Sequence, residues 1–159
     1  MHPAGTRTFS ARSKLCWMTV AFMMISSLPA TASLGGLETS VLGDQEQLKG
    51  TRRVTVNAAY SVHEIQAATG TTVREFVSPA GTVFAVAWQG PFTPSLRQIL
   101  GSYFDQYKQA IQNRRARSGP ISVRQGNLVV ETGGHMRSFF GRAYLPQMLP
   151  PDVTARTIK

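Results

Sequence analysis

The sequence predicts an α+β fold in which one long helix packs on an antiparallel, curved sheet of about five or six strands. Two adjacent patterns within residues 71–111 lead to this prediction. The first is a hairpin signal, because Pro79 presets the backbone for the second position of a type I turn and Gly81 suits the last position. The second is a helix start at Thr93 and Pro94, which follows the hairpin directly. A hairpin followed by an amphipathic helix indicates a helix layer on an antiparallel sheet.

Residues 82–88 are predicted to form a central strand, since they are rich in β-branched and aromatic side chains and carry no charge. Regular alternation would place Phe84, Val86 and Trp88 on one face of the sheet. Ala85 and Ala87 would then lie on the other face, and small side chains let a helix approach closely. We therefore expect the helix on the Ala85 and Ala87 side, with the reverse placement left open.

The long helix is expected near residues 94–115. Thr93 can accept a hydrogen bond from a first-turn amide, and the missing N–H of Pro94 would be unpaired there anyway. Gly101 lies outside the apolar stripe and costs about 1 kcal/mol relative to alanine in a helix interior, which suggests a close contact or a slight bend. The apolar stripe recurs at intervals of three and four, at Leu96, Ile99, Leu100, Tyr103, Phe104, Tyr107 and Ile111.

The other elements follow from local patterns. Residues 33–53 contain scattered apolar side chains among four glycines, and we expect an irregular N-terminal arm. Residues 54–159 are expected to form a single α+β domain that starts with a strand at 54–65, in an antiparallel meander with the first hairpin. A second hairpin is predicted over 121–132 and a further strand over 135–145, before a proline-rich extended tail.

Residues 1–32 have the organisation of a secretory signal peptide. A basic start is followed by an apolar run at 15–25 and by a small-x-small motif that ends at Ala32. We expect cleavage after Ala32, a mature chain that begins at Ser33, and export to the periplasm or secretion. The apolar run is about half of the roughly 20 residues that a membrane span needs, so no transmembrane span is expected after cleavage. An uncleaved anchor is the alternative.

The chain is basic, with 17 Lys and Arg residues against 8 Asp and Glu residues and a net charge of +9. Removal of residues 1–32 would take three of the basic residues and none of the acidic ones, which leaves +6. In an exported protein this charge favours anionic envelope lipid or polysaccharide, or another envelope protein, as the partner. Nucleic acid is not expected in that compartment. The alternative is that the charge only keeps the surface soluble.

The segment GGHMRSFFGRAYLP is the nearest to a functional site in the sequence. We predict a binding site for an anionic or amphipathic ligand at Trp88, His135 and Arg137, against the alternative that Trp88 belongs to the core. His135 could act as a base with Glu131 or Glu64 as its orienting carboxylate, but no nucleophile context accompanies it. A non-catalytic binding protein is therefore favoured, with no cofactor and no metal, and a small periplasmic enzyme that uses His135 is the alternative.

The order of several sequence blocks resembles an exported proteobacterial family known as domain of unknown function 2844. The resemblance covers the chain from LGG at 34–36 to LPPDV at 149–153, and VFAVAWQGP and GGHM are its most specific blocks. It implies export and a single domain. It supplies no activity, cofactor or catalytic residue.

Overall fold

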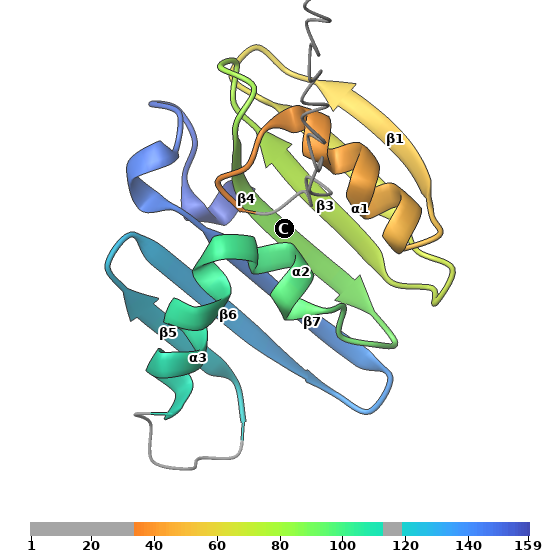
Figure 1. The fold of residues 1–159 in the computed structure, drawn as a ribbon, viewed down its shortest axis with the longest axis vertical. Helices are drawn as coiled ribbons and strands as arrows, with labels where there is room; N and C mark the ends of the chain where they lie inside the picture. Colours follow the sequence, from red (N-terminus) through yellow and green to blue (C-terminus); the bar gives the residue numbers. More distant parts are fainter. Residues whose placement is uncertain (1–33, 113–118) are drawn as a thin grey trace, which may run out of the picture.

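A computed structural model describes residues 34–112 and 119–159, and it has an α+β fold with one antiparallel sheet of seven strands (Figure 1). The strand order is β1-β2-β3-β4-β7-β6-β5. The strands are β1 (Thr51–Val56), β2 (Ser61–Gln66), β3 (Thr72–Val77), β4 (Val83–Gly90), β5 (Ile121–Gln125), β6 (Leu128–His135) and β7 (Ser138–Tyr144). The helices are α1 (Val41–Gln47), α2 (Leu96–Leu100) and α3 (Phe104–Gln112), with 3₁₀ turns η1 (Glu38–Ser40), η2 (Gly101–Tyr103), η3 (Pro146–Met148) and η4 (Ala155–Thr157).

The predicted fold class is confirmed, but the sheet has seven strands where five or six were expected. The extra strand arises because residues 54–65 form a hairpin and not one strand. The chain reverses at Asn57, whose N–H donates to the Tyr60 carbonyl at 2.9 Å. Asn57, Ala58 and Ala59 have weak strand preference, which favours a turn between two β-branched segments. The expected meander of β2, β3 and β4 is confirmed, and β4 lies in the middle of the sheet.

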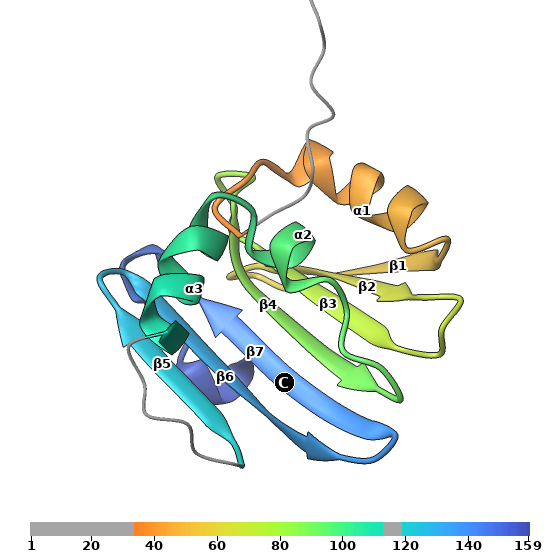
Figure 2. The same cartoon turned by 60° about the horizontal axis from the view of Figure 1, so that its bottom comes forward.

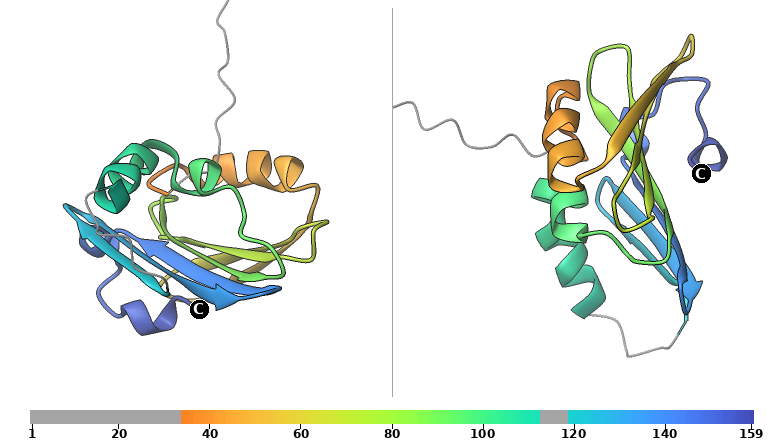
Figure 3. Two further views of the ribbon diagram at one scale, coloured as in Figure 1. Left: turned by 90° about the horizontal axis from the view of Figure 1, so that it is seen from below. Right: turned by 90° about the vertical axis from the view of Figure 1, so that its right-hand side faces the viewer.

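The molecule has three layers (Figure 3). Helices α1, α2 and α3 cover one face of the sheet, and we call it the helix face. The segment that follows β7 covers part of the opposite face, which we call the tail face. Each interface has a core of buried apolar side chains, with Ile99 and Leu100 on the helix face and Val153 and Ile158 on the tail face.

The prediction of one long helix is wrong, because Gly101 interrupts it between α2 and α3. Gly101 has φ +50° and ψ −121°, a backbone conformation outside the helical region that residues with a Cβ rarely adopt. The irregular arm expected at 33–53 is also corrected, since α1 lies within it and buries Val41 against the sheet. Gly43 inside α1 weakens its helix signal in the sequence.

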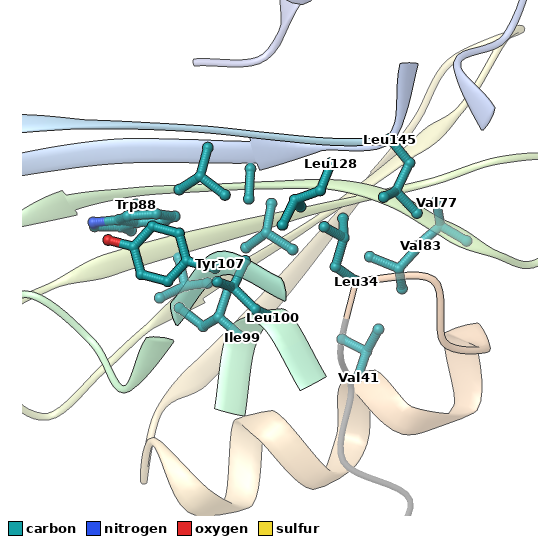
Figure 4. Close-up of a cluster of buried hydrophobic side chains, with 14 of the residues drawn as sticks. Leu34, Val41, Val77, Val83, Trp88, Ile99, Leu100, Tyr107, Leu128 and Leu145 are labelled. Carbon is teal, nitrogen blue, oxygen red and sulfur yellow. The ribbon is translucent and has the colours of Figure 1, made fainter. Parts of the chain in front are cut away.

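The predicted faces of β4 are wrong in part because of a β-bulge. Phe76 pairs with Ala85 whereas Val77 pairs with Val83, which leaves Phe84 as the extra residue. Phe84 therefore shares the tail face with Ala85 and Ala87, and the helices pack on the other face (Figure 4). The bulge moves only Phe84, since Val86 and Trp88 still lie opposite Ala85 and Ala87 as predicted. The expected helix placement on the Ala85 and Ala87 side is wrong for a separate reason: the helices pack on the bulkier side chains of the strand. The helix face of β4 carries Val83, Val86 and Trp88, next to Ile99, Leu100 and Tyr107.

The N-terminal predictions lie outside the described residues. The signal peptide 1–32, cleavage after Ala32 and a mature start at Ser33 remain predictions. Among the described residues, no helix is long and apolar enough to cross a membrane.

Candidate binding cleft

A cleft of about 530 Å³ opens on the sheet beside the C-terminal residues. Residues of β4, β5, β6 and β7 line it, including Gln89, Ile121 and Phe140. Ile158 closes it from the C-terminal segment. Its volume lies within the range of about 300–1,000 Å³ that is usual for small-molecule sites, so the cleft can hold a compact ligand.

Arg142 forms a charge-compensated wall of the cleft. Its Nε donates to Glu131 Oε2 at 2.7 Å, and its Nη2 lies 2.6 Å from the same oxygen. Its Nη1 donates to the carbonyls of Ala155 at 2.5 Å and Ile158 at 3.3 Å. These bonds fasten the η4 turn to β7, and they use most of the guanidinium donors. Arg142 therefore shapes the cleft, and its charge is already matched by Glu131.

Two glycines allow aromatic side chains to pack closely against β6 and β7. A Cβ added at Gly141 would lie 2.3 Å from the Trp88 indole, and one added at Gly133 would lie 2.8 Å from the Phe140 ring. Neither position could carry a side chain without displacing a ring. The Phe140 ring stays 55% exposed. Gly133 thus lets the half-exposed Phe140 ring lie against β6 on the tail face, whereas Gly141 makes room for the buried Trp88 indole on the helix face.

The three residues predicted as a site are not brought together in the cleft. Trp88 is among the residues that line it, although the indole is 2% exposed and packs in the helix-face core. His135 and Arg137 are exposed at the β6–β7 turn and do not line it. Glu64 and Glu131, considered above as partners of His135, form ion pairs with arginines 74 and 142. The lining residues Phe140, Ile121 and Gln89 were not predicted, because they come from strands that meet only in the folded sheet.

A second polar group lies beneath α1, where Asp44 and Glu75 are each 1% exposed. A hydrogen bond joins their carboxyls, and Gln98 Nε2 of α2 donates to Asp44 Oδ1 at 2.8 Å. Burial raises the pKa of Asp44. Burial also raises the pKa of Glu75, and together with the hydrogen bond to Asp44 and the charge of Asp44 it brings this pKa to about 9. Within the described residues, Asp44 Oδ2 and Glu75 Oε2 receive no other donor. The two carboxyls therefore share at least one proton at neutral pH.

His63 lies opposite Glu75 in the β2–β3 pair and is 1% exposed. Arg52 Nη1 lies 3.0 Å from Nδ1, and Glu38 Oε1 lies 3.1 Å from Nε2. Because arginine can only donate, Nδ1 is the acceptor and the ring proton sits on Nε2, where it donates to Glu38. Burial lowers the pKa of His63 although Glu38 opposes this shift, so the ring is neutral at pH 7.

This buried group joins α1 and α2 to the sheet, and none of its members lines the cleft. Sequence reasoning missed Asp44 and Glu75. One signal was available, because Glu75 stands between Val73 and Val77 in the alternation of an otherwise apolar strand face. Among the described residues, no group of three or more His, Cys, Asp or Glu side chains is arranged to hold a metal ion.

Comparison with known proteins adds one match. The model of a family described as "Protein of unknown function (DUF2844)" matches residues 30–158. No curated protein and no solved structure matches the chain.

Proposed function

This chain belongs to the DUF2844 family of proteins of unknown function, and we propose that it is an exported, non-catalytic binding protein of the cell envelope that holds a small amphipathic ligand in the cleft. The observation that carries the proposal is the half-exposed Phe140 ring in the wall of the cleft on the tail face. An exposed aromatic wall favours an apolar ligand body. The export part of the proposal rests on the predicted signal peptide.

The polar groups of the cleft indicate how the ligand is oriented. Arg142 is already paired with Glu131, so it offers little net charge to a ligand. Gln89 and Lys159 are exposed at the cleft and can accept or attract a polar or anionic head group. An acyl or aromatic body against Phe140, with its head group near Gln89 and Lys159, satisfies both kinds of lining. A fatty acid has this chemistry and is the probe we choose.

Binding can be measured through the fluorescence of Trp88. The sequence contains two tryptophans, so Trp17→Phe leaves Trp88 as the sole emitter in the full chain. Titration with a brominated fatty acid should quench Trp88 saturably, because bromine quenches an indole only at short range. Phe140→Ala should weaken binding about tenfold, since loss of about 1.4 kcal/mol of apolar contact changes the dissociation constant by that factor.

Leu42→Ala is the control. Leu42 is 51% exposed, close to the 55% of Phe140, but it does not line the cleft. It should leave the affinity unchanged. Absence of saturable quenching, or equal weakening by both variants, would contradict the proposal.

A further inference from the structure

Three turns gather at one end of the sheet: residues 67–71 between β2 and β3, residues 91–95 between β4 and α2, and residues 135–138 between β6 and β7. Strand pairing brings them together, since Gly90 pairs with Phe139 and Thr72 pairs with Gln89. Thr71 Oγ1 also donates to the Phe92 carbonyl at 2.9 Å. The loop after β4 and the β6–β7 turn lie side by side in both views (Figures 1 and 2). We call these three turns the turn end.

The turn end combines exposed apolar side chains with positive charge. Met136 is 88% exposed and Phe92 is 55% exposed. None of the three turns contains Asp or Glu, and their ionisable residues are His135 and Arg137. Large exposed apolar side chains are costly in water unless another surface covers them. Their position beside a cation, on a chain of net charge +9, is complementary to an anionic surface with an apolar interior.

The backbone of the β6–β7 turn supports a role for its side chains. Arg137 has φ +61°, in the left-handed region where glycine is favoured over residues with a Cβ. The two-residue loop between His135 and Ser138 therefore holds Met136 and Arg137 outward at a cost that glycine would avoid. A turn selected for stability alone would gain from glycine at this position.

We propose that the turn end docks on an anionic lipid membrane, with Met136 and Phe92 entering the headgroup boundary and Arg137 contacting lipid phosphates. The turn end shares no residue with the lining of the cleft. The docking proposal and the cleft proposal can therefore fail separately.

The first test places a fluorophore at single cysteines in the full chain. Cys16 is the only natural cysteine, so Cys16→Ser provides the background. An environment-sensitive label on Met136→Cys should shift to shorter wavelength with vesicles of phosphatidylcholine and phosphatidylglycerol, and much less with phosphatidylcholine alone. The matched label on Val56→Cys should stay in water. Val56 is 77% exposed, and it lies at the end of β1 that is remote from the turn end. The label reports only the surroundings of position 136, so binding of vesicles to the apolar run at 15–25 would not by itself shift its emission.

The second test separates docking from stability. Arg137→Gln, in the labelled chain, should weaken binding to the anionic vesicles about fivefold, whereas Arg124→Gln, at an exposed position of β5, should not. Arg137→Gly should weaken docking equally while it raises the melting temperature, because it relieves the left-handed residue. The proposal is overturned if the label at position 136 stays in water, if it shifts equally with neutral vesicles, or if Arg124→Gln weakens binding as much as Arg137→Gln.

Discussion

Glu75→Gln should remove a pH dependence of stability that the buried acid pair imposes. Glutamine keeps the size of the side chain and can donate to Asp44, but it carries no titratable proton. The pKa of Glu75 is raised by burial from 4.5 to about 9 in the folded protein. Between these values the folded protein holds a proton that the unfolded chain releases. The stability of the native protein is therefore greatest below pH 4.5 with respect to this group, and it is lost as pH rises towards 9.

The size of the effect follows from linkage. One proton held only by the folded state changes the free energy of unfolding by about 1.36 kcal/mol per pH unit. From pH 7.0 to 8.5 the native protein should lose about 2 kcal/mol relative to Glu75→Gln, which corresponds to a fall of about 8 °C in melting temperature for a domain of this size. His63 adds little over this interval, because burial lowers its pKa in the folded state and the unfolded ring is mostly neutral above pH 7.

The assay is urea unfolding of the native protein and the variant at several pH values between 7.0 and 8.5. The difference between the two proteins cancels the titrating groups that do not interact with Glu75, which leaves the Asp44–Glu75 pair. Glu64→Gln is the control, because the Glu64 side chain is 39% exposed and pairs with Arg74 on the surface. Its stability should run parallel to that of the native protein. Parallel curves for Glu75→Gln as well would refute the shared proton in the Asp44–Glu75 pair.

Further changes probe the backbone and the cleft. Gly101→Ala should cost about 1–3 kcal/mol in the free energy of unfolding, because alanine is strained at φ +50° and ψ −121°, and a chemical denaturation curve unchanged from the native one would contradict this. Gly141→Ala should cost about 1–3 kcal/mol by displacing Trp88 and should shift the indole emission, with an unshifted spectrum as the contrary result. Arg142→Gln should cost about 2 kcal/mol and expose residues 155–159 to limited proteolysis, since η4 loses its donors, and native-like resistance would count against that role. N-terminal sequencing of exported protein should begin at Ser33, and recovery of Met1 would show that the signal peptide is retained.

Some of the fold could be predicted because the signal lies in adjacent residues. Pro79 and Gly81 define the first hairpin turn, and the uncharged β-branched run at 82–88 becomes the central strand β4. Thr93 and Pro94 mark the approach to α2, which begins at Leu96. Turn and strand preferences are properties of a few consecutive dihedral angles, so they can be recognised before the chain folds.

Other features depend on contacts between distant segments. The bulge moves Phe84 to the tail face of β4, and no local pattern in 82–88 indicates which residue is extra. Asp44 meets Glu75 only after α1 packs on β3, and the raised pKa of Glu75 exists only in that buried pair.

The cleft has the same origin. Phe140 forms a wall because β7 pairs with β4, and Ile158 closes the cleft because Arg142 holds the η4 turn. The amino-acid sequence by itself determined the local turns, the central strand and the fold class. The faces of the strands, the acid pair and the cleft were decided by tertiary structure, because register, burial and side-chain pairing are set when remote segments exclude water together.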